Sequence, residues 1–239
     1  MVSAAIQREL ESLGEVARVA ILQRFFKTGP GEYGAGDRFR GIRVPVLRGL
    51  ARKYQGVSLV EAKRLLQSAF HEDRLLALLI LMRRYYQDGQ LVRKKIHRLY
   101  LAHTRWVNSW DLVDASAPHL VGHYLSDHSD DTLNRLAASG DLWERRIAII
   151  ATFHFIKQND FAETLRIACL LLSDPEDLIH KAVGWMLREV EKRQTAVAEA
   201  FLQTHYRKMP RTMLRYAIER LPEARRQAYL KGTVVCNLV

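Results

Sequence analysis

Trp110 and Asp114, four positions apart, have the residue types and spacing best suited to chemistry in this sequence. Ser109 is a typical N-cap residue and Pro118 a typical helix terminator, so the segment between them predicts a helix of about two turns. Residues four apart share one helix face. An indole plane beside a carboxylate can hold and react a cationic planar group. The alternative is a core tryptophan beside a surface or capping aspartate, which is a common pairing.

The charge of the chain indicates a polyanionic partner. Its 239 residues include 37 Lys and Arg against 26 Asp and Glu, a net charge of +11. Nucleic acid is the first candidate partner and an anionic membrane surface the second; the alternative is a soluble protein that is simply basic. Hydrophobic residues make up 48%, enough for a large core, and the length suits one domain or two at most.

Cysteine content and apolar runs predict the setting. Cys169 and Cys236 are too few for a disulfide framework, which fits a reducing, cytoplasmic environment. No signal-peptide pattern is visible. The longest apolar run, Leu75 to Met82, is too short to span a bilayer. We therefore expect a cytoplasmic protein without a membrane span.

Helical periodicity covers nearly the whole chain, so we predict an all-α fold. The exception lies between Lys27 and Asp37, where glycines and Pro30 exclude a helix. A mobile loop, or a short hairpin touching a partner, is favoured there over a phosphate-binding loop, because no Gly-Lys-Ser/Thr follows. After two N-terminal helices, the expected helices are 45–54, 58–67, 72–87, 90–103, 109–118, 119–126, 129–139, 142–157, 161–172, 177–193, 197–205, 211–221 and 223–231.

An alanine followed by an apolar residue recurs at Ala77, Ala148, Ala182 and Ala217, at steps of about 35 residues or twice that. This period predicts HEAT-like helix pairs that stack into one domain over residues 1–239, a right-handed α-solenoid with a concave basic groove. The missing repeat falls at Leu112-Val113 or one residue later. Asp114 then lies at or beside a position that is apolar in the other repeats. We therefore expect its carboxylate to be partly shielded from solvent, which makes Asp114 a functional candidate.

Basic residues cluster on single predicted helices and toward the C-terminal end. They either line a groove that contacts the phosphates of a duplex or cover solvated outer faces. The clusters are Arg83 and Arg84; Arg93, Lys94, Lys95 and Arg98; and Arg207, Lys208, Arg211, Arg215, Arg220, Arg225, Arg226 and Lys231.

Four sequence blocks carry a resemblance to a known family. They are residues 39–45 (Phe-Arg-Gly-Ile-Arg-Val-Pro), 109–114 (Ser-Trp-Asp-Leu-Val-Asp), 143–148 (Trp-Glu-Arg-Arg-Ile-Ala) and 181–189 (Lys-Ala-Val-Gly-Trp-Met-Leu-Arg-Glu). In order and spacing, the chain resembles the AlkD-like DNA alkylation repair proteins, which are DNA glycosylases built of HEAT-like repeats. The last block is the most specific of the four, and the first is loose.

The resemblance implies an activity without a cofactor. The substrate would be duplex DNA bearing a cationic purine such as 3-methyladenine or 7-methylguanine, and hydrolysis of the N-glycosidic bond would leave an abasic site without flipping the base into a pocket. Trp110 and Trp185 would face the lesion, and Asp114 would be the catalytic carboxylate. Because the alkylated base is a cationic leaving group, the main task is to stabilise an oxocarbenium-like sugar, which a carboxylate can do.

The resemblance also implies DNA contacts. Arg146 would hold the backbone near the lesion and Arg188 would be a second contact. Arg43 stands where well-characterised members have a polar residue that approaches the DNA, so it is a further DNA-binding candidate. The basic cluster on the predicted helix 90–103 adds Lys94 and Lys95 independently of the resemblance. Taken alone, Trp185 could be a core residue and Arg146 could pair with an acid. Trp143 is interpreted as packing and Asp111 as structural.

His119 and His123 lie four positions apart, and Asp127 follows four later, which could form a metal-binding helix face. No metal site is expected there, because the sequence shows no further strong ligand to complete the set. No lysine is placed like a Schiff-base nucleophile, so strand cleavage is not expected, and a monomer is assumed. The Gly-rich segment is longer than the turn associated with well-characterised members of the family. A non-enzymatic binder of damaged or branched DNA, or a protein-binding solenoid, therefore remains an alternative.

Overall fold

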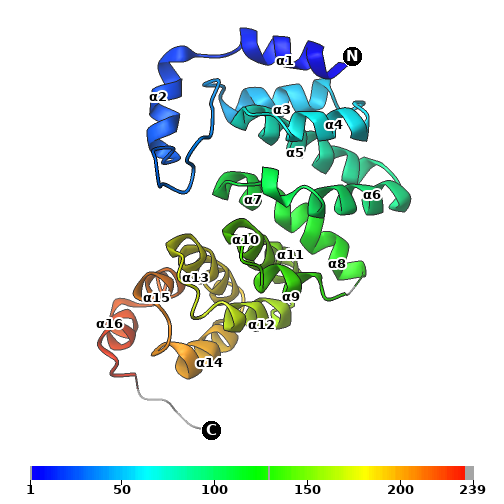
Figure 1. Ribbon diagram of the computed structural model, residues 1–239. Helices are drawn as coiled ribbons and strands as arrows, with labels where there is room; N and C mark the ends of the chain where they lie inside the picture. The colour runs from blue at the N-terminus through cyan, green and yellow to red at the C-terminus, as the bar shows by residue number, and fades with distance from the viewer. Residues whose placement is uncertain (1, 129, 235–239) are drawn as a thin grey trace. The chain divides into compact units, whose positions relative to one another are not determined.

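The computed structural model describes residues 2–128 and 130–234, so the predictions at Ser129 and Cys236 lie outside the described residues. The predicted all-α fold is confirmed (Figure 1). Among the described residues, the only β-type pairing is a single bridge between Arg38 and Phe70. The helices are α1 Val2–Ser12, α2 Val16–Phe25, α3 Val44–Lys53, α4 Leu59–Leu66, α5 His71–Gln87, α6 Gln90–Leu101, η1 Thr104–Trp106, α7 Trp110–Ala117, η2 Pro118–Gly122, α8 His123–Asp127, α9 Thr132–Ala137, α10 Leu142–Ala151, α11 Phe153–Lys157, α12 Ala162–Leu170, α13 Asp177–Glu191, α14 Thr195–His205, α15 Arg211–Ala217 and α16 Glu223–Lys231.

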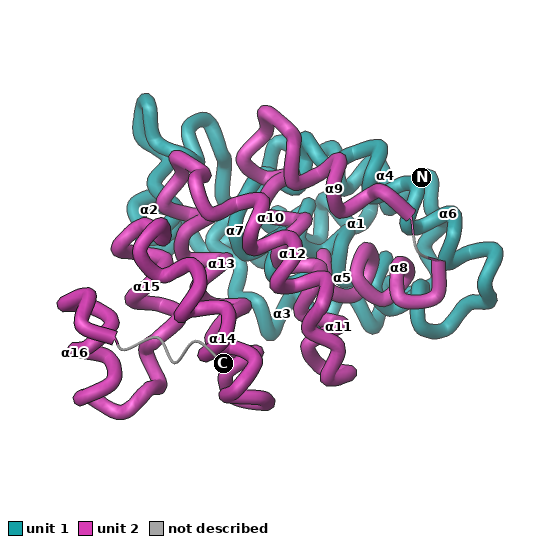
Figure 2. The backbone as a smooth tube through the Cα atoms, turned by 90° about the horizontal axis from the view of Figure 1, so that it is seen from below, with its two compact units in different colours: residues 1–116 teal, residues 117–239 magenta. Residues whose placement is uncertain are grey.

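The chain forms two compact units, residues 1–116 and residues 117–239, shown in teal and magenta in Figure 2. Unit 1 contains α1 to η1 and nearly all of α7. Unit 2 begins with the last residue of α7 and contains the remaining helices. The single repeat domain and its concave groove stay predictions.

In unit 1, α5 is the helix against which α3 and α4 pack, and α1 packs on α4. Helix α5 is apolar on all sides through its middle, as expected for a helix with neighbours all round. Leu76, Leu78, Ile80 and Leu81 are fully buried there. Its first turn is also buried, although it consists of charged and polar residues (His71 to Arg74). Burial of such a turn requires partners from elsewhere in the chain.

In unit 2, α13 packs against α10, α14 and α15. Gly184 allows the closest of these approaches, because a Cβ at this position would lie 2.5 Å from the Met213 carbonyl oxygen and 2.5 Å from the Tyr216 Cβ. Glycine in a helix interior costs stability in isolation. Here that cost is offset by the contact between the α13 and α15 backbones.

The repeated alanines mark positions of close helix packing. Ala77, Ala148, Ala182 and Ala217 lie on α5, α10, α13 and α15, and each is at most 2% exposed. At the missing repeat, Leu112 and Val113 are both fully buried, and the half-buried Asp114 follows them. The partly shielded position expected for this carboxylate is therefore confirmed.

Helix α7 ends at Ala117, directly before Pro118, as predicted, but the backbone stays helical beyond it. The backbone remains helical at Ala117 (φ −58°, ψ −42°), passes through the π-helical segment η2 and continues into α8. A proline in a helix interior lacks the N–H for the i−4 bond and clashes with that carbonyl. A π-helical turn is one of the local adjustments by which a helix absorbs such a disruption. The helix expected at 142–157 is instead divided at Thr152 into α10 and α11.

Candidate active site on α7

Helix α7 presents Trp110 at its first position and Asp114 one turn later, and both side chains are half-buried in unit 1. Their spacing places them on one face of the helix. Ser109 precedes the helix as predicted, but the prediction that its side chain caps the helix is wrong. Its hydroxyl is buried without a hydrogen-bond partner, while its carbonyl accepts from the Val113 N–H at 3.1 Å.

The Trp110 indole packs against two consecutive phenylalanines at the end of α2. Phe26 stacks on it, with ring centroids 5.4 Å apart and ring planes 20° apart. Phe25 contacts it edge-on, at 5.8 Å and 70°. Phe39 stacks in turn on Phe26 at 5.1 Å. Phe26 therefore covers one face of the indole.

Below these rings, a buried ionic network ties α7 to α5 and to the end of the Gly-rich segment. The His71 Nε2 lies 2.8 Å from Asp111 and its Nδ1 lies 2.9 Å from Asp37. Arg74 donates to both Asp37 oxygens at 2.8 Å. Asp111 therefore has the structural role predicted for it, as an anchor of the first turn of α7.

The electrostatics of this network favour a charged imidazole. Burial lowers the pKa of His71, but hydrogen bonds to Asp111 and Asp37, together with their charges, raise it overall to about 9. Burial acts to raise the pKa of Asp37, yet the hydrogen bond from His71 and the charge of Arg74 leave it below its usual range. His71 is thus an imidazolium between two carboxylates at neutral pH. Sequence reasoning missed His71, although His-Glu-Asp-Arg at the start of a long apolar helix was a visible signal.

The block at residues 39–45 is held on α5 by Glu72. This carboxylate accepts the backbone N–H groups of Arg40 at 2.9 Å, Gly41 at 2.8 Å and Ile42 at 3.2 Å. Gly41 has φ +86°, and a Cβ there would lie 2.2 Å from the Glu15 carbonyl oxygen. The glycine of this block is therefore explained by backbone packing, and the block positions the segment that carries Phe39.

The Gly-rich segment from Lys27 to Asp37 is non-helical as predicted, but it is a series of tight turns rather than a hairpin. Backbone bonds join Glu32 to Gly29, Gly34 to Lys27, and Asp37 to Gly34. The Glu32 carboxylate also accepts the Gly29 N–H at 2.8 Å. The segment starts beside Phe26 and ends at Asp37, so the network at His71 and the stack at Trp110 hold its two ends.

Trp185 lies on α13 in unit 2 and is half-buried. Its Nε1 donates to Glu189 at 3.0 Å, and its ring lies 5.8 Å from that of Phe153. The hydrogen bond fixes the orientation of the indole on its helix. Trp143, predicted to be a packing residue, is buried on α10.

The basic candidates differ in accessibility. Arg146 is only 5% exposed and donates to the Leu178 carbonyl at 2.6 Å, an internal bond between α10 and the start of α13. This bond gives Arg146 a packing role within unit 2, and the DNA contact predicted for it stays a prediction. Arg188 is bound to Glu219. Lys94, Lys95 and Arg43 are exposed in unit 1, with Arg43 3.8 Å from Glu15.

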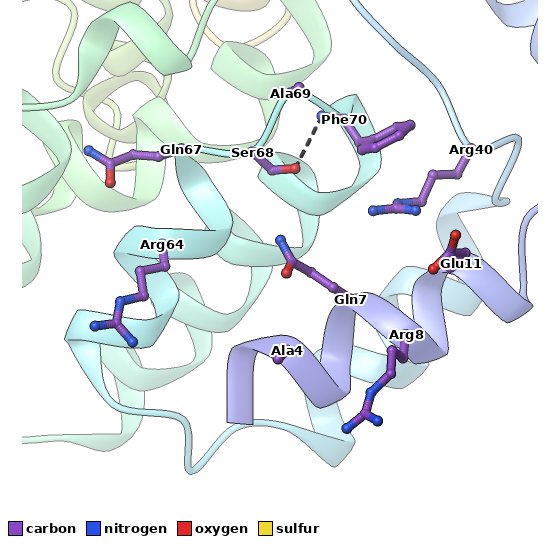
Figure 3. A pocket seen from close by; sticks show the side chains of 10 residues that line it. All are labelled: Ala4, Gln7, Arg8, Glu11, Arg40, Arg64, Gln67, Ser68, Ala69 and Phe70. Carbon is purple, nitrogen blue, oxygen red and sulfur yellow. Dashed lines mark hydrogen bonds between the residues drawn. The ribbon is translucent and has the colours of Figure 1, made fainter. Parts of the chain in front are cut away.

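A cavity of about 590 Å³ lies in unit 1 between α1, α4 and residues 67–70, which precede α5 (Figure 3). The Arg40 guanidinium lies 3.8 Å from the centre of the Phe70 ring at its wall and pairs with Asp73 at 2.7 Å. Neither Trp110 nor Asp114 lines this cavity. The α7 pair is therefore part of a different surface.

In unit 2, the His123 ring lies 4.9 Å from that of His154. Within residues 2–128 and 130–234, no group of three or more His, Cys, Asp or Glu side chains could hold a metal ion. Nor does any helix of the described chain have the length and apolar character needed to cross a membrane.

Comparison with known proteins identifies the family. The family model described as DNA alkylation repair enzyme matches residues 6–221. The chain belongs to this family. A solved structure, described as a predicted DNA alkylation repair enzyme from Enterococcus faecalis, is similar with a TM-score of 0.69 and 16% identity, over 88% of this chain and 97% of that one. No curated protein matches the sequence.

Membership of the DNA alkylation repair enzyme family confirms the resemblance found in the four sequence blocks. It assigns the chain a role in repairing alkylated DNA, with DNA as its partner. The neighbour from Enterococcus faecalis supports the all-helical fold. One of the four blocks contains Trp110 and Asp114 of α7, another contains Trp185 of α13, and the block at 39–45 carries Phe39, which stacks on the Phe26 ring that covers Trp110.

Proposed function

We propose that this protein is a monofunctional DNA glycosylase that hydrolyses the N-glycosidic bond of cationic N3- or N7-alkylated purines in duplex DNA. The observation that carries the proposal is the half-buried pair Trp110 and Asp114 on one face of α7. It occurs in a chain that belongs to a family of DNA alkylation repair enzymes.

The residue types suit this reaction. An alkylated purine is already a good leaving group, so the transition state concentrates positive charge on the sugar. The Asp114 carboxylate would stabilise that charge and orient the attacking water. The face of Trp110 that Phe26 does not cover would attract the cationic base. Trp185, with its indole fixed by Glu189, is the second aromatic candidate.

Recognition without base flipping is part of the proposal. Because Phe26 covers one face of Trp110, this indole can contact a ligand on one side only. A base sandwiched between Trp110 and another ring would require both a deep slot and an extruded nucleotide. A one-sided contact instead suits a base that stays in the duplex, with the DNA backbone bound by exposed cations such as Lys94 and Lys95.

Base release from methylated duplex DNA tests the proposal. The native protein should free 3-methyladenine or 7-methylguanine, and Asp114→Asn should slow single-turnover release by about 100-fold or more, because the variant cannot stabilise the positive charge on the sugar. The matched control is Glu11→Gln, which neutralises an exposed carboxylate on α1. If Asp114→Asn releases the alkylated base as fast as the native protein, the glycosylase activity is supported, but the role proposed for Asp114 is excluded.

A non-enzymatic binder of damaged or branched DNA is the second candidate. The long Gly-rich segment from Lys27 to Asp37 supports it, because it differs from the shorter turn associated with well-characterised members of the family. This candidate predicts tight, salt-sensitive DNA binding by the native protein with no release of any alkylated base.

A further inference from the structure

The C-terminal end of α2 exposes one aromatic ring and buries the next. Phe25 is 61% exposed, whereas Phe26 is 8% exposed. No residue of α2 itself is buried. Phe25 is therefore an exposed aromatic ring in contact with a candidate site residue.

Phe25 and Trp110 form an aromatic corner, which we define as these two rings, with centroids 5.8 Å apart and planes 70° apart. Phe26, which is buried, stacks on one face of Trp110 and supports the aromatic corner from within unit 1. Asp114 follows Trp110 by one helical turn. The faces of aromatic rings attract cations, and the exposed Phe25 ring enlarges the aromatic surface next to Trp110.

The corner is held in place by its backbone and by Phe26. The Glu15 N–H donates to the Arg40 carbonyl at 3.0 Å, and the Arg18 Nε donates to the Gly41 carbonyl at 3.1 Å. These bonds attach the first turn of α2 to the segment that Glu72 fixes on α5. At the other end, Phe26 lies in the stack between Phe39 and Trp110. The position of Phe25 therefore does not depend on a ligand.

We infer that Phe25 is a specificity-determining residue, which together with Trp110 recognises the positive charge of the alkylated base. The inference rests on the proposed function for the assignment of Trp110 to the lesion. A methylated purinium is attracted to the faces of both rings, whereas a neutral base of the same shape gains only contact area. Phe25 would then select charged lesions over neutral ones.

Equilibrium binding separates charge recognition from excision. The probes are duplexes of one sequence that contain 7-methylguanine, its neutral isostere 7-deaza-7-methylguanine, or guanine. All proteins carry Asp114→Asn, which keeps the cationic base in place during the measurement. The measured quantity is the preference, defined as the Kd for the neutral isostere divided by the Kd for 7-methylguanine.

Phe25→Leu keeps an apolar side chain and removes the π-face, so the preference should fall about threefold, the scale of one exposed cation–π contact. Phe25→Tyr should retain it. Ile21→Leu, at a 67%-exposed position of the same helix, is the matched control and should change nothing. Thermal unfolding of all three variants should match that of the parent protein.

The outcomes distinguish this inference from the proposed function. An equal loss of affinity for all three duplexes in Phe25→Leu, or an unchanged preference, would overturn the role of Phe25. The absence of any preference in the parent protein would overturn the aromatic corner. If the native protein excises no base, yet the preference exists and falls in Phe25→Leu, charge recognition stands while the glycosylase proposal fails.

Discussion

At the scale of single residues, the least expected group is His71. It is buried, and its two ring nitrogens contact carboxylates from segments 34 and 40 residues away in sequence. Burial of an imidazolium is favourable only when both N–H groups are paired with acceptors, as they are here with Asp37 and Asp111. His71 thereby links the end of the Gly-rich segment to the first turn of the helix that carries Trp110 and Asp114.

The pKa of His71 predicts a pH dependence of stability. Its folded pKa, about 9, lies above the unfolded value of 6.5. The imidazolium therefore contributes stability fully below pH 6.5, and this contribution disappears as the pH rises through 9. Urea unfolding followed by tryptophan fluorescence should give a lower midpoint at pH 9.5 than at pH 6.

The matched variant is His71→Gln, which cannot carry the charge and leaves Asp37 and Asp111 with weaker partners. It should be destabilised by roughly 3 kcal/mol at pH 6, the scale of breaking a buried ion pair, and its midpoint should vary less between pH 6 and pH 9.5. A native midpoint that is constant over this range would show that the pKa of His71 is not raised by folding.

At the scale of elements, two helix-interior glycines are superficially alike and structurally different. Gly184 of α13 lies against the backbone of α15, whereas the Cβ position of Gly49 on α3 meets only the end of the Arg52 side chain, at 3.9 Å. Sequence propensity treats both as equally unfavourable. Only the packing of α13 on α15 explains why one of them is required.

The two glycine positions give opposite predictions. Gly184→Ala should destabilise the protein by about 1–3 kcal/mol, because the added methyl overlaps the α15 backbone. Gly49→Ala should stabilise it by about 0.5–1 kcal/mol, because alanine is the better helix former and space is available. Urea denaturation of both variants checks the pair. Equal effects of the two substitutions would contradict the close approach at Gly184.

At the scale of the whole molecule, the excess of basic residues matters for binding DNA, and accessibility decides which of them contribute. Lys94 and Lys95 are exposed on α6, while Arg146 is buried and bonded to Leu178. Only an exposed cation can displace the counterions condensed on DNA. Net charge therefore overstates the number of phosphate contacts.

The salt dependence of DNA binding measures this difference. Lys94→Gln and Lys95→Gln should each reduce the slope of log K against log salt by about one, because each substitution removes a cation that can neutralise one phosphate. Arg146→Met should leave the slope unchanged while lowering stability, because its partner is a buried carbonyl. A reduced slope in a folded Arg146→Met protein would instead support the DNA contact predicted from the family resemblance.

The sequence by itself determined the helices, the packed alanines and the pairing of Trp110 with Asp114 on one face. These features depend on periods of 3.6 or about 35 residues, which can be recognised directly in the order of residues along the chain. The tertiary structure decided that Phe26 covers one face of Trp110, that His71 holds Asp111 and that Arg146 is buried. Such contacts join residues 30 or more positions apart. They depend on how helices pack against one another, which the local sequence pattern does not predict.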